Sequence, residues 1–225
     1  MTHGFSRAMA CALACAAALL SGGCVNPPKA YDYTAFRQAR PATLLVLPPL
    51  NESTDVKATA GVWSHATLPL AEAGYYVLPV ALVDETFRQN GVTVAQDAHA
   101  IAHEKLRDYF GADAALYLRV TRYGTSYAVV ASETRVEVHA RLVDLRSGQL
   151  LWDGRAFATS ANQQSQGGLA ALLIGALVNQ IVGTATDAAY NYAGVATTRL
   201  LGAPRFNGVL PGPRSPDYGK PLPER

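Results

Sequence analysis

The sequence has few cysteines, and all of them lie at one end. Cys11, Cys15 and Cys24 fall within the first 24 of 225 residues. The rest of the chain can hold no disulfide, catalytic thiol or thiolate metal site, because each of these needs a cysteine sulfur. The cysteines near the N-terminus therefore need an explanation other than stability or catalysis.

Charge is also sparse. Charged residues make up 16% of the chain, the formal net charge is +2, and no basic run is present. Such a chain has no strong attraction to nucleic acid, so we expect no nucleic-acid partner. Apolar residues amount to 49%, which excludes an intrinsically disordered chain and suffices for one good-sized core.

Motifs for catalysis and for cofactor binding are missing. No serine lies in a G-x-S-x-G elbow, and Pro48 and Pro49 stand where a glycine-rich phosphate loop would follow the first expected strand. His99 and His103 have the spacing of a helical metal pair, but no third ligand is evident. We expect a solvated histidine pair on one helix, no metal, no cofactor and no enzymatic activity.

What the N-terminus does have is the pattern of an export signal. A weakly positive start with Arg7 precedes an apolar run over Ala8–Leu20, and Ser21–Gly23 are small. Thirteen helical residues cover about 20 Å, short of the roughly 30 Å hydrocarbon core, so a permanent transmembrane anchor is not expected. Small residues before a cysteine resemble a bacterial lipobox. We predict a lipoprotein signal peptide at 1–23 and lipidation of Cys24; an ordinary cleaved signal is the alternative.

The residues around Cys24 also indicate a location. A lipobox usually has leucine three positions before the cysteine, where this chain has Ser21. By resemblance to lipoprotein sorting, Val25 instead of aspartate after the cysteine points to the outer membrane. We expect a lipid anchor there with the protein on the periplasmic side, and exposure on the cell surface stays open. Three prolines and no apolar periodicity predict a lipidated tether at 24–42.

The remaining pattern predicts one globular domain over 43–201. Apolar runs at 43–47 and 75–80 flank a helical pattern at 56–73, which indicates a βαβ unit with parallel strands. Two further helices and three alternating strands are expected at 81–89, 98–110, 116–121, 135–142 and 149–159. The fold class is therefore α/β, a mixed α+β sheet with a βαβ start and an antiparallel meander with one wet face.

A long C-terminal helix should begin near Leu169, and its first part is apolar all round. The residues predicted to contact a membrane or another subunit are Leu169, Leu172, Leu173, Ile174, Leu177 and Val178. Three environments are open for this stretch: the core of the domain, a subunit interface in a homo-oligomer, or lipid. The Pro/Gly-rich tail at 202–225 is expected to dock on the surface or to be disordered.

Several strings carry a resemblance over nearly the whole mature chain. They are "YDYTAFRQARPATLLVLPPLNES", "PLAEAGYYVLPVALVDETFRQNG", "FGADAALYLRVTRYGTSY", "LVDLRSGQLLWDG" and "NGVLPGPRSPDYG". The chain resembles a family of uncharacterised lipoproteins of Gram-negative bacteria, typified by a meningococcal genome-derived vaccine antigen. The family has no known catalytic residues, so the resemblance transfers a functional role to Cys24 alone.

Two strings are similar to more distant proteins. "LLVLPPLNES" and "ARLVDLRSGQLLWDG" resemble the opening strand and closing hairpin of the periplasmic domain of the curli-secretion lipoprotein CsgG and of the TolB N-terminal domain. This resemblance implies a sheet of about five strands with helices packed on it. Because family members are often encoded beside a CsgG-like lipoprotein, it also implies such a protein as partner.

Three functions follow as hypotheses. The leading one is an accessory or assembly component of a CsgG-like secretion or envelope system, anchored in the membrane through its lipid. The second is a membrane-inserting or oligomeric channel-type subunit that uses Leu169–Val178. The third is a periplasmic ligand-binding module.

Overall fold

The structure, a computed structural model, describes residues 29–127, 132–161 and 188–224. It divides into two units, Met1–Ala30 and Tyr31–Arg225, and every element below belongs to the second unit. The predicted signal peptide, Cys24 and the apolar stretch Leu169–Val178 lie outside the described residues.

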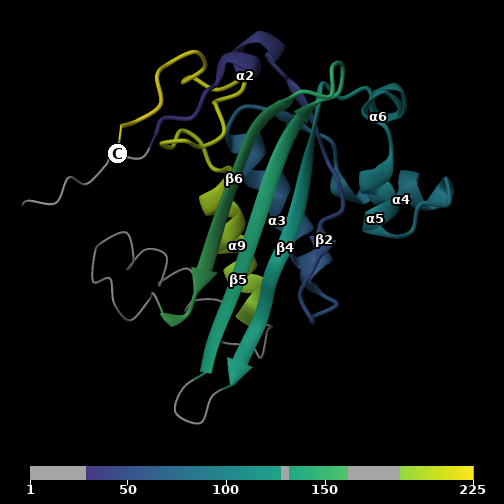
Figure 1. The fold of residues 1–225 in the computed structure, drawn as a ribbon, viewed down its shortest axis with the longest axis vertical. Helices are drawn as coiled ribbons and strands as arrows, with labels where there is room; N and C mark the ends of the chain where they lie inside the picture. Colours follow the sequence, from purple (N-terminus) through teal and green to yellow (C-terminus); the bar gives the residue numbers. More distant parts are fainter. Residues whose placement is uncertain (1–28, 128–131, 162–187, 225) are drawn as a thin grey trace, which may run out of the picture. The chain divides into compact units, whose positions relative to one another are not determined.

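Within the described ranges, six strands form one mixed sheet (Figure 1). Their bounds are β1 Thr43–Val46, β2 Leu50–Asn51, β3 Tyr76–Val77, β4 Ala114–Tyr127, β5 Ser132–Asp144 and β6 Leu150–Thr159. The order is β3-β1-β4-β5-β6, and β2 pairs with β4 beside this path. β1 is parallel to β3 and β4, whereas β4, β5 and β6 pair antiparallel. The predicted βαβ start and antiparallel meander are confirmed.

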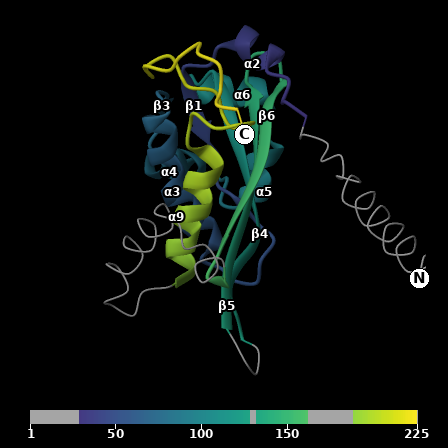
Figure 2. The same ribbon diagram turned by 90° about the vertical axis from the view of Figure 1, so that its left-hand side faces the viewer.

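Helices cover both faces of this sheet. Those described are α2 Thr34–Ala39, α3 Ala58–Glu72, α4 Val80–Gln89, α5 Ala95–Ala100, α6 His103–Phe110 and α9 Ala188–Leu201. The chain crosses from β1 to β3 in one direction and from β3 to β4 in the other. Because such crossovers are right-handed, α3 falls on one face and α4–α6 on the opposite one. α9 packs beside α3 behind β4–β6 (Figures 1 and 2).

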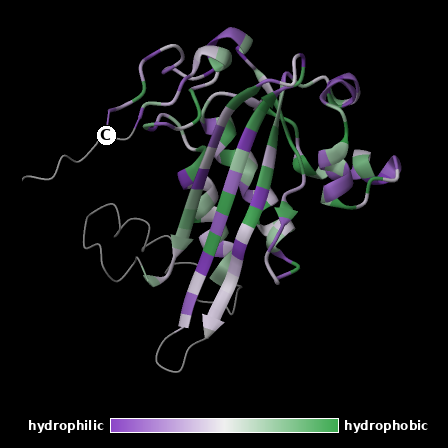
Figure 3. Ribbon diagram, viewed as in Figure 1, coloured by the Kyte–Doolittle hydropathy of each residue, from purple (hydrophilic) through white to green (hydrophobic). Residues whose placement is uncertain are grey.

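The meander has one buried and one wet face, as its alternating sequence predicts. Leu116, Leu142 and Trp152 form a cross-strand row that is at most 1% exposed. Burial of each such side chain contributes about 1.5–3 kcal/mol relative to exposure. The alternate residues point to the other face, where Arg119 is exposed and its cross-strand partner His139 is partly exposed. Figure 3 shows these hydrophilic positions alternating along the strands.

One helix prediction needs correction. The helix expected over 98–110 is two helices, because Ile101 and Ala102 have extended backbone conformations, with ψ of 132° and 139°. Pro69 lies inside α3, which continues to Glu72.

The tether prediction for 24–42 is wrong from Tyr31 onward. Residues from Tyr31 onward belong to the folded unit, and α2 lies at 34–39. Tyr33 and Phe36 are buried, with 8% and 3% of their surface exposed. Their rings pack at a centroid distance of 6.4 Å. A helix of six residues is too short to give a clear periodic apolar pattern, so the sequence does not reveal it.

The packing of α3 against α9 predicts a loss of stability in acid. The His65 ring lies 4.4 Å from that of Tyr190, and its Nε2 is buried without a hydrogen-bond partner. Burial lowers the pKa of His65. Burial is also the main cause that lowers the pKa of His99. The unfolded chain then binds more protons than the folded one below about pH 6.5, so stability falls as pH drops through that range.

We expect the melting temperature of wild type to fall between pH 7.5 and pH 5.5, and that of His65→Phe to fall less, since phenylalanine keeps the ring contact but cannot titrate. His99 should account for part of the remaining fall. His139→Gln serves as a control that removes a histidine which is not buried. Equal falls in wild type and His65→Phe would contradict this interpretation.

Candidate functional site

The residues singled out in the sequence do not form a site in the described part of the chain. Cys24 and the six apolar residues from Leu169 to Val178 lie outside it. His99 lies on α5 and His103 begins α6, so the two histidines do not share a helix. Among the described residues, no three His, Cys, Asp or Glu side chains group closely enough to hold a metal ion.

His99 and His103 each contact a different neighbour in the fold. His99 is half-buried, its Nε2 lies 2.9 Å from the Pro48 carbonyl oxygen, and its ring meets that of Tyr117 edge-on at 5.1 Å. Nδ1 of His103 lies 2.7 Å from Oε2 of Glu104. The prediction of a solvated pair on one helix is therefore wrong, because the chain breaks the helix between them.

The structure points to a different place, the end of the domain where the tail docks. The Tyr33 hydroxyl donates to the Gly208 carbonyl at 2.5 Å, and the Trp152 Nε1–H donates to the Asn207 carbonyl at 3.0 Å. The Tyr31 backbone N–H donates to Oδ1 of Asn207 at 2.9 Å. Burial raises the pKa of Tyr33 to about 12, so this hydroxyl keeps its proton and acts as a donor. Two aromatic donors thus hold successive tail carbonyls.

A third aromatic donor continues the pattern along the tail. The Tyr75 hydroxyl donates to the Leu210 carbonyl at 2.6 Å, and burial raises the pKa of this tyrosine. Val209, between the captured carbonyls, is 1% exposed. The part of the tail at 207–210 is therefore a packed component of the fold, and of the two alternatives for 202–225, docking holds for this stretch.

Backbone hydrogen bonds extend the docking beyond the aromatic donors. The Gly212 N–H donates to the Ala73 carbonyl at 2.7 Å, and the Arg214 N–H donates to the Gly74 carbonyl at 3.1 Å. Gly74 has a φ of +95°, and a Cβ there would collide with the backbone nitrogen of Ser215. The turn after α3 and the tail therefore approach more closely than a side chain would allow.

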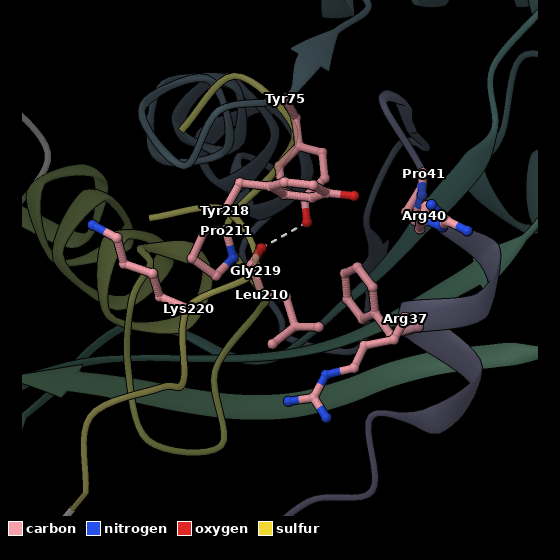
Figure 4. A pocket seen from close by; sticks show the side chains of 10 residues that line it. Arg37, Arg40, Pro41, Tyr75, Leu210, Pro211, Tyr218, Gly219 and Lys220 are labelled. Atoms are coloured by element: carbon pink, nitrogen blue, oxygen red, sulfur yellow. Dashed lines mark hydrogen bonds between the residues drawn. The ribbon is translucent and has the colours of Figure 1, made fainter. Parts of the chain in front are cut away.

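Between the tail and α2 lies a small cavity of about 170 Å³ (Figure 4). It is lined by Phe36, Arg37, Arg40, Pro41, Tyr75, Leu210, Pro211, Tyr218, Gly219 and Lys220. The side chains of Arg37, Arg40 and Lys220 lie apart on three sides of it. This volume is below the roughly 300–1,000 Å³ of sites for small organic ligands. Cations around an aromatic floor suit an anionic group at the rim rather than an enclosed ligand.

A wider hollow of about 580 Å³ is lined by Tyr31 and by residues 205–208 of the tail. Arg155 and Arg199 also line it, together with Asp153. The Arg205 side chain donates to the carbonyl oxygen of Arg199. Burial, and secondly the charge of Arg199, lower the pKa of Arg205. Basic residues therefore line both this hollow and the smaller cavity beside the tail.

Sequence reasoning missed this site. The available signals were the aromatics at 31, 33 and 36, just after the expected tether, and the glycines at 208 and 212 in the tail. Neither set has a helical or strand period, and their partners lie far away along the chain.

No helix in the described ranges is both long enough and apolar enough to span a membrane.

A mixed sheet with helices on both faces, closed by its own C-terminal tail, makes this an α/β domain of a kind that occurs in bacterial lipoproteins. The chain belongs to the GNA1162-like family, whose model, described as "Putative lipoprotein GNA1162-like", matches residues 31–214. The family predicted from the sequence strings is therefore confirmed. The similarity to CsgG and the TolB N-terminal domain stays a prediction.

Relatives from Neisseria meningitidis support this assignment. The chain is 48% identical over 203 residues to "Putative lipoprotein NMB1124/NMB1162" of serogroup B, which covers 90% of this chain and 94% of the relative. It is also similar to the crystal structure of lipoprotein GNA1162, with 53% identity and a TM-score of 0.53. That match covers 64% of this chain and 100% of the other.

The close approach at Gly74 gives a test of the docked tail. Gly74→Ala and Gly91→Ala both place alanine at a positive φ, +95° and +79°, but a Cβ at Gly91 meets nothing within 4 Å. We expect Gly74→Ala to lower the free energy of unfolding by about 1–3 kcal/mol more than Gly91→Ala, because only the former pushes the tail away. Urea denaturation of both variants measures the difference. Equal losses would mean that the tail does not pack against Gly74.

Proposed function

We propose that this chain is an outer-membrane lipoprotein, acylated at Cys24, whose domain faces the periplasm. There it has a non-catalytic role as an accessory or assembly component of a secretion or envelope complex that contains a CsgG-like lipoprotein. The observation that carries the proposal is membership of a lipoprotein family through a match over 31–214, which begins seven residues after the lipobox-like Cys24.

The start of the folded unit supports an anchoring role for Cys24. The unit begins at Tyr31, and an extended chain from Cys24 to Tyr31 reaches at most about 25 Å. The predicted tether of 18 residues, Val25–Ala42, would have reached roughly 60 Å. An acyl group on Cys24 would therefore hold the domain near the bilayer surface, where a short reach favours partners in the same membrane.

A single purification tests both parts of this proposal. We expect the full chain, extracted from membranes in detergent through a C-terminal tag, to begin at Cys24 with the mass of two or three acyl chains. A CsgG-like lipoprotein should co-purify with it. Mass spectrometry of the N-terminus and of the co-purified proteins gives the two readouts.

The chain offers a matched control for the anchor. Cys24→Ala should abolish acylation and shift the protein out of the membrane fraction, whereas Cys15→Ala, inside the apolar run, should leave both unchanged. A mature N-terminus at another residue would overturn the anchor. Repeated recovery of the acylated protein alone would overturn the partnership and leave the anchor standing.

A further inference from the structure

Positive charge is concentrated at the tail-closed end of the domain. We define the basic end as residues 31–41 and 199–220, which contain six basic and two acidic residues. The rest of the chain from Cys24 onward contains twelve basic and fifteen acidic residues. A net charge of +4 on the basic end thus opposes −3 on the remainder, although the chain as a whole is nearly neutral.

The two segments of the basic end form one surface. The Tyr31 N–H and the Tyr33 hydroxyl donate to Asn207 and Gly208, which joins the N-terminal segment to the tail. α2 and the tail lie together at the same end of the domain in both ribbon views (Figures 1 and 2). The basic residues of the two segments therefore lie at the same end of the folded domain.

Most of these cations lack a carboxylate partner within the described ranges. Lys220 pairs with Asp217, with 3.0 Å between Nζ and Oδ1. The cations without such a pair include Arg37, Arg40, Arg199 and Arg205. Of these four, Arg37, Arg40 and Arg205 are exposed. Uncompensated cations on a surface attract anions from outside the protein.

The same end presents an aromatic ring between the cations. Tyr218 is 46% exposed and lies in the cavity that Arg37, Arg40 and Lys220 surround. Exposed tyrosine beside arginine and lysine is the composition of protein surfaces at the headgroup level of a bilayer.

We propose that the basic end docks on anionic phospholipid headgroups of the membrane that holds the chain. The inference rests on the proposed anchor at Cys24 for its setting, because the chain enters the folded unit at Tyr31, within this surface. The anchor keeps the domain near the bilayer, and the basic end orients it. The acidic remainder of the domain then faces away from the membrane.

Vesicle binding by a chain without the lipid tests the inference apart from the anchor. The chain from residue 24 carrying Cys24→Ser is mixed with vesicles of equal parts phosphatidylglycerol and phosphatidylcholine, or of phosphatidylcholine alone, and co-sedimentation is measured. We expect binding to the anionic vesicles only, with loss of binding on addition of salt.

Matched charge variants locate the surface. R37Q/R40Q/R205Q should weaken binding by roughly fivefold for each charge near the bilayer, on the order of a hundredfold in all. R88Q/R107Q/R122Q removes the same charge from α4, α6 and β4 and should keep binding within about twofold. Should the first variant fail to fold by circular dichroism, R37Q/R40Q keeps the Arg205 contact and should weaken binding by roughly 25-fold.

Each result decides the inference. Equal binding of both triple variants, or equal binding to both vesicle types, would overturn it. Absence of vesicle binding together with acylated Cys24 in cells would overturn the docking of the basic end on headgroups but not the anchor. Arginine-dependent binding by a protein whose Cys24 is not acylated in cells would support the surface and overturn the anchor.

Discussion

The capture of the tail's carbonyl oxygens by three aromatic donors holds this domain together at one end. Tyr33 comes from the start of the folded unit, Tyr75 from the turn before β3, and Trp152 from β6. Residues 207–210 of the tail therefore link three parts of the chain that belong to different elements. Without it, these buried hydroxyl and indole donors would lose their partners, at a cost of about 1–3 kcal/mol each.

This closure also positions the basic end. It brings the entry of the chain at Tyr31 to the same end as the C-terminal segment, and it carries Arg205 and Lys220 there. The opposite arrangement, a free basic tail, would spread these charges through solvent. A docked tail instead makes a fixed surface of net positive charge a few residues after the expected anchor. In the proposed function, anchoring and orientation would depend on neighbouring residues, and the wet face of the meander and the α4–α6 side would stay accessible to partners.

The sequence predicted those parts of the fold that have a local period. The apolar run of β1 and the alternation of β5 gave correct strands, and their succession gave the parallel start and the antiparallel meander, whereas β2 and the order of the strands in the sheet were not predicted. The tail and α2 have no apolar period, and they are held in place by residues far away along the chain. Trp152 and Asn207 are 55 residues apart, and Tyr33 and Gly208 are 175 residues apart. Such contacts depend on the assembled fold. The helix break at Ile101 was not predicted because the helical pattern of the sequence continues across it.

The most direct test of the docked tail is hydrogen exchange at the Gly212 and Arg214 amides, which donate to Ala73 and Gly74. In the full chain these amides should exchange nearly as slowly as that of Leu78, which donates to the Leu44 carbonyl in the sheet. Exchange at the rate of an unfolded chain, with Leu78 still protected, would show that the tail is not part of the fold. The closed end and its basic surface would then be wrong.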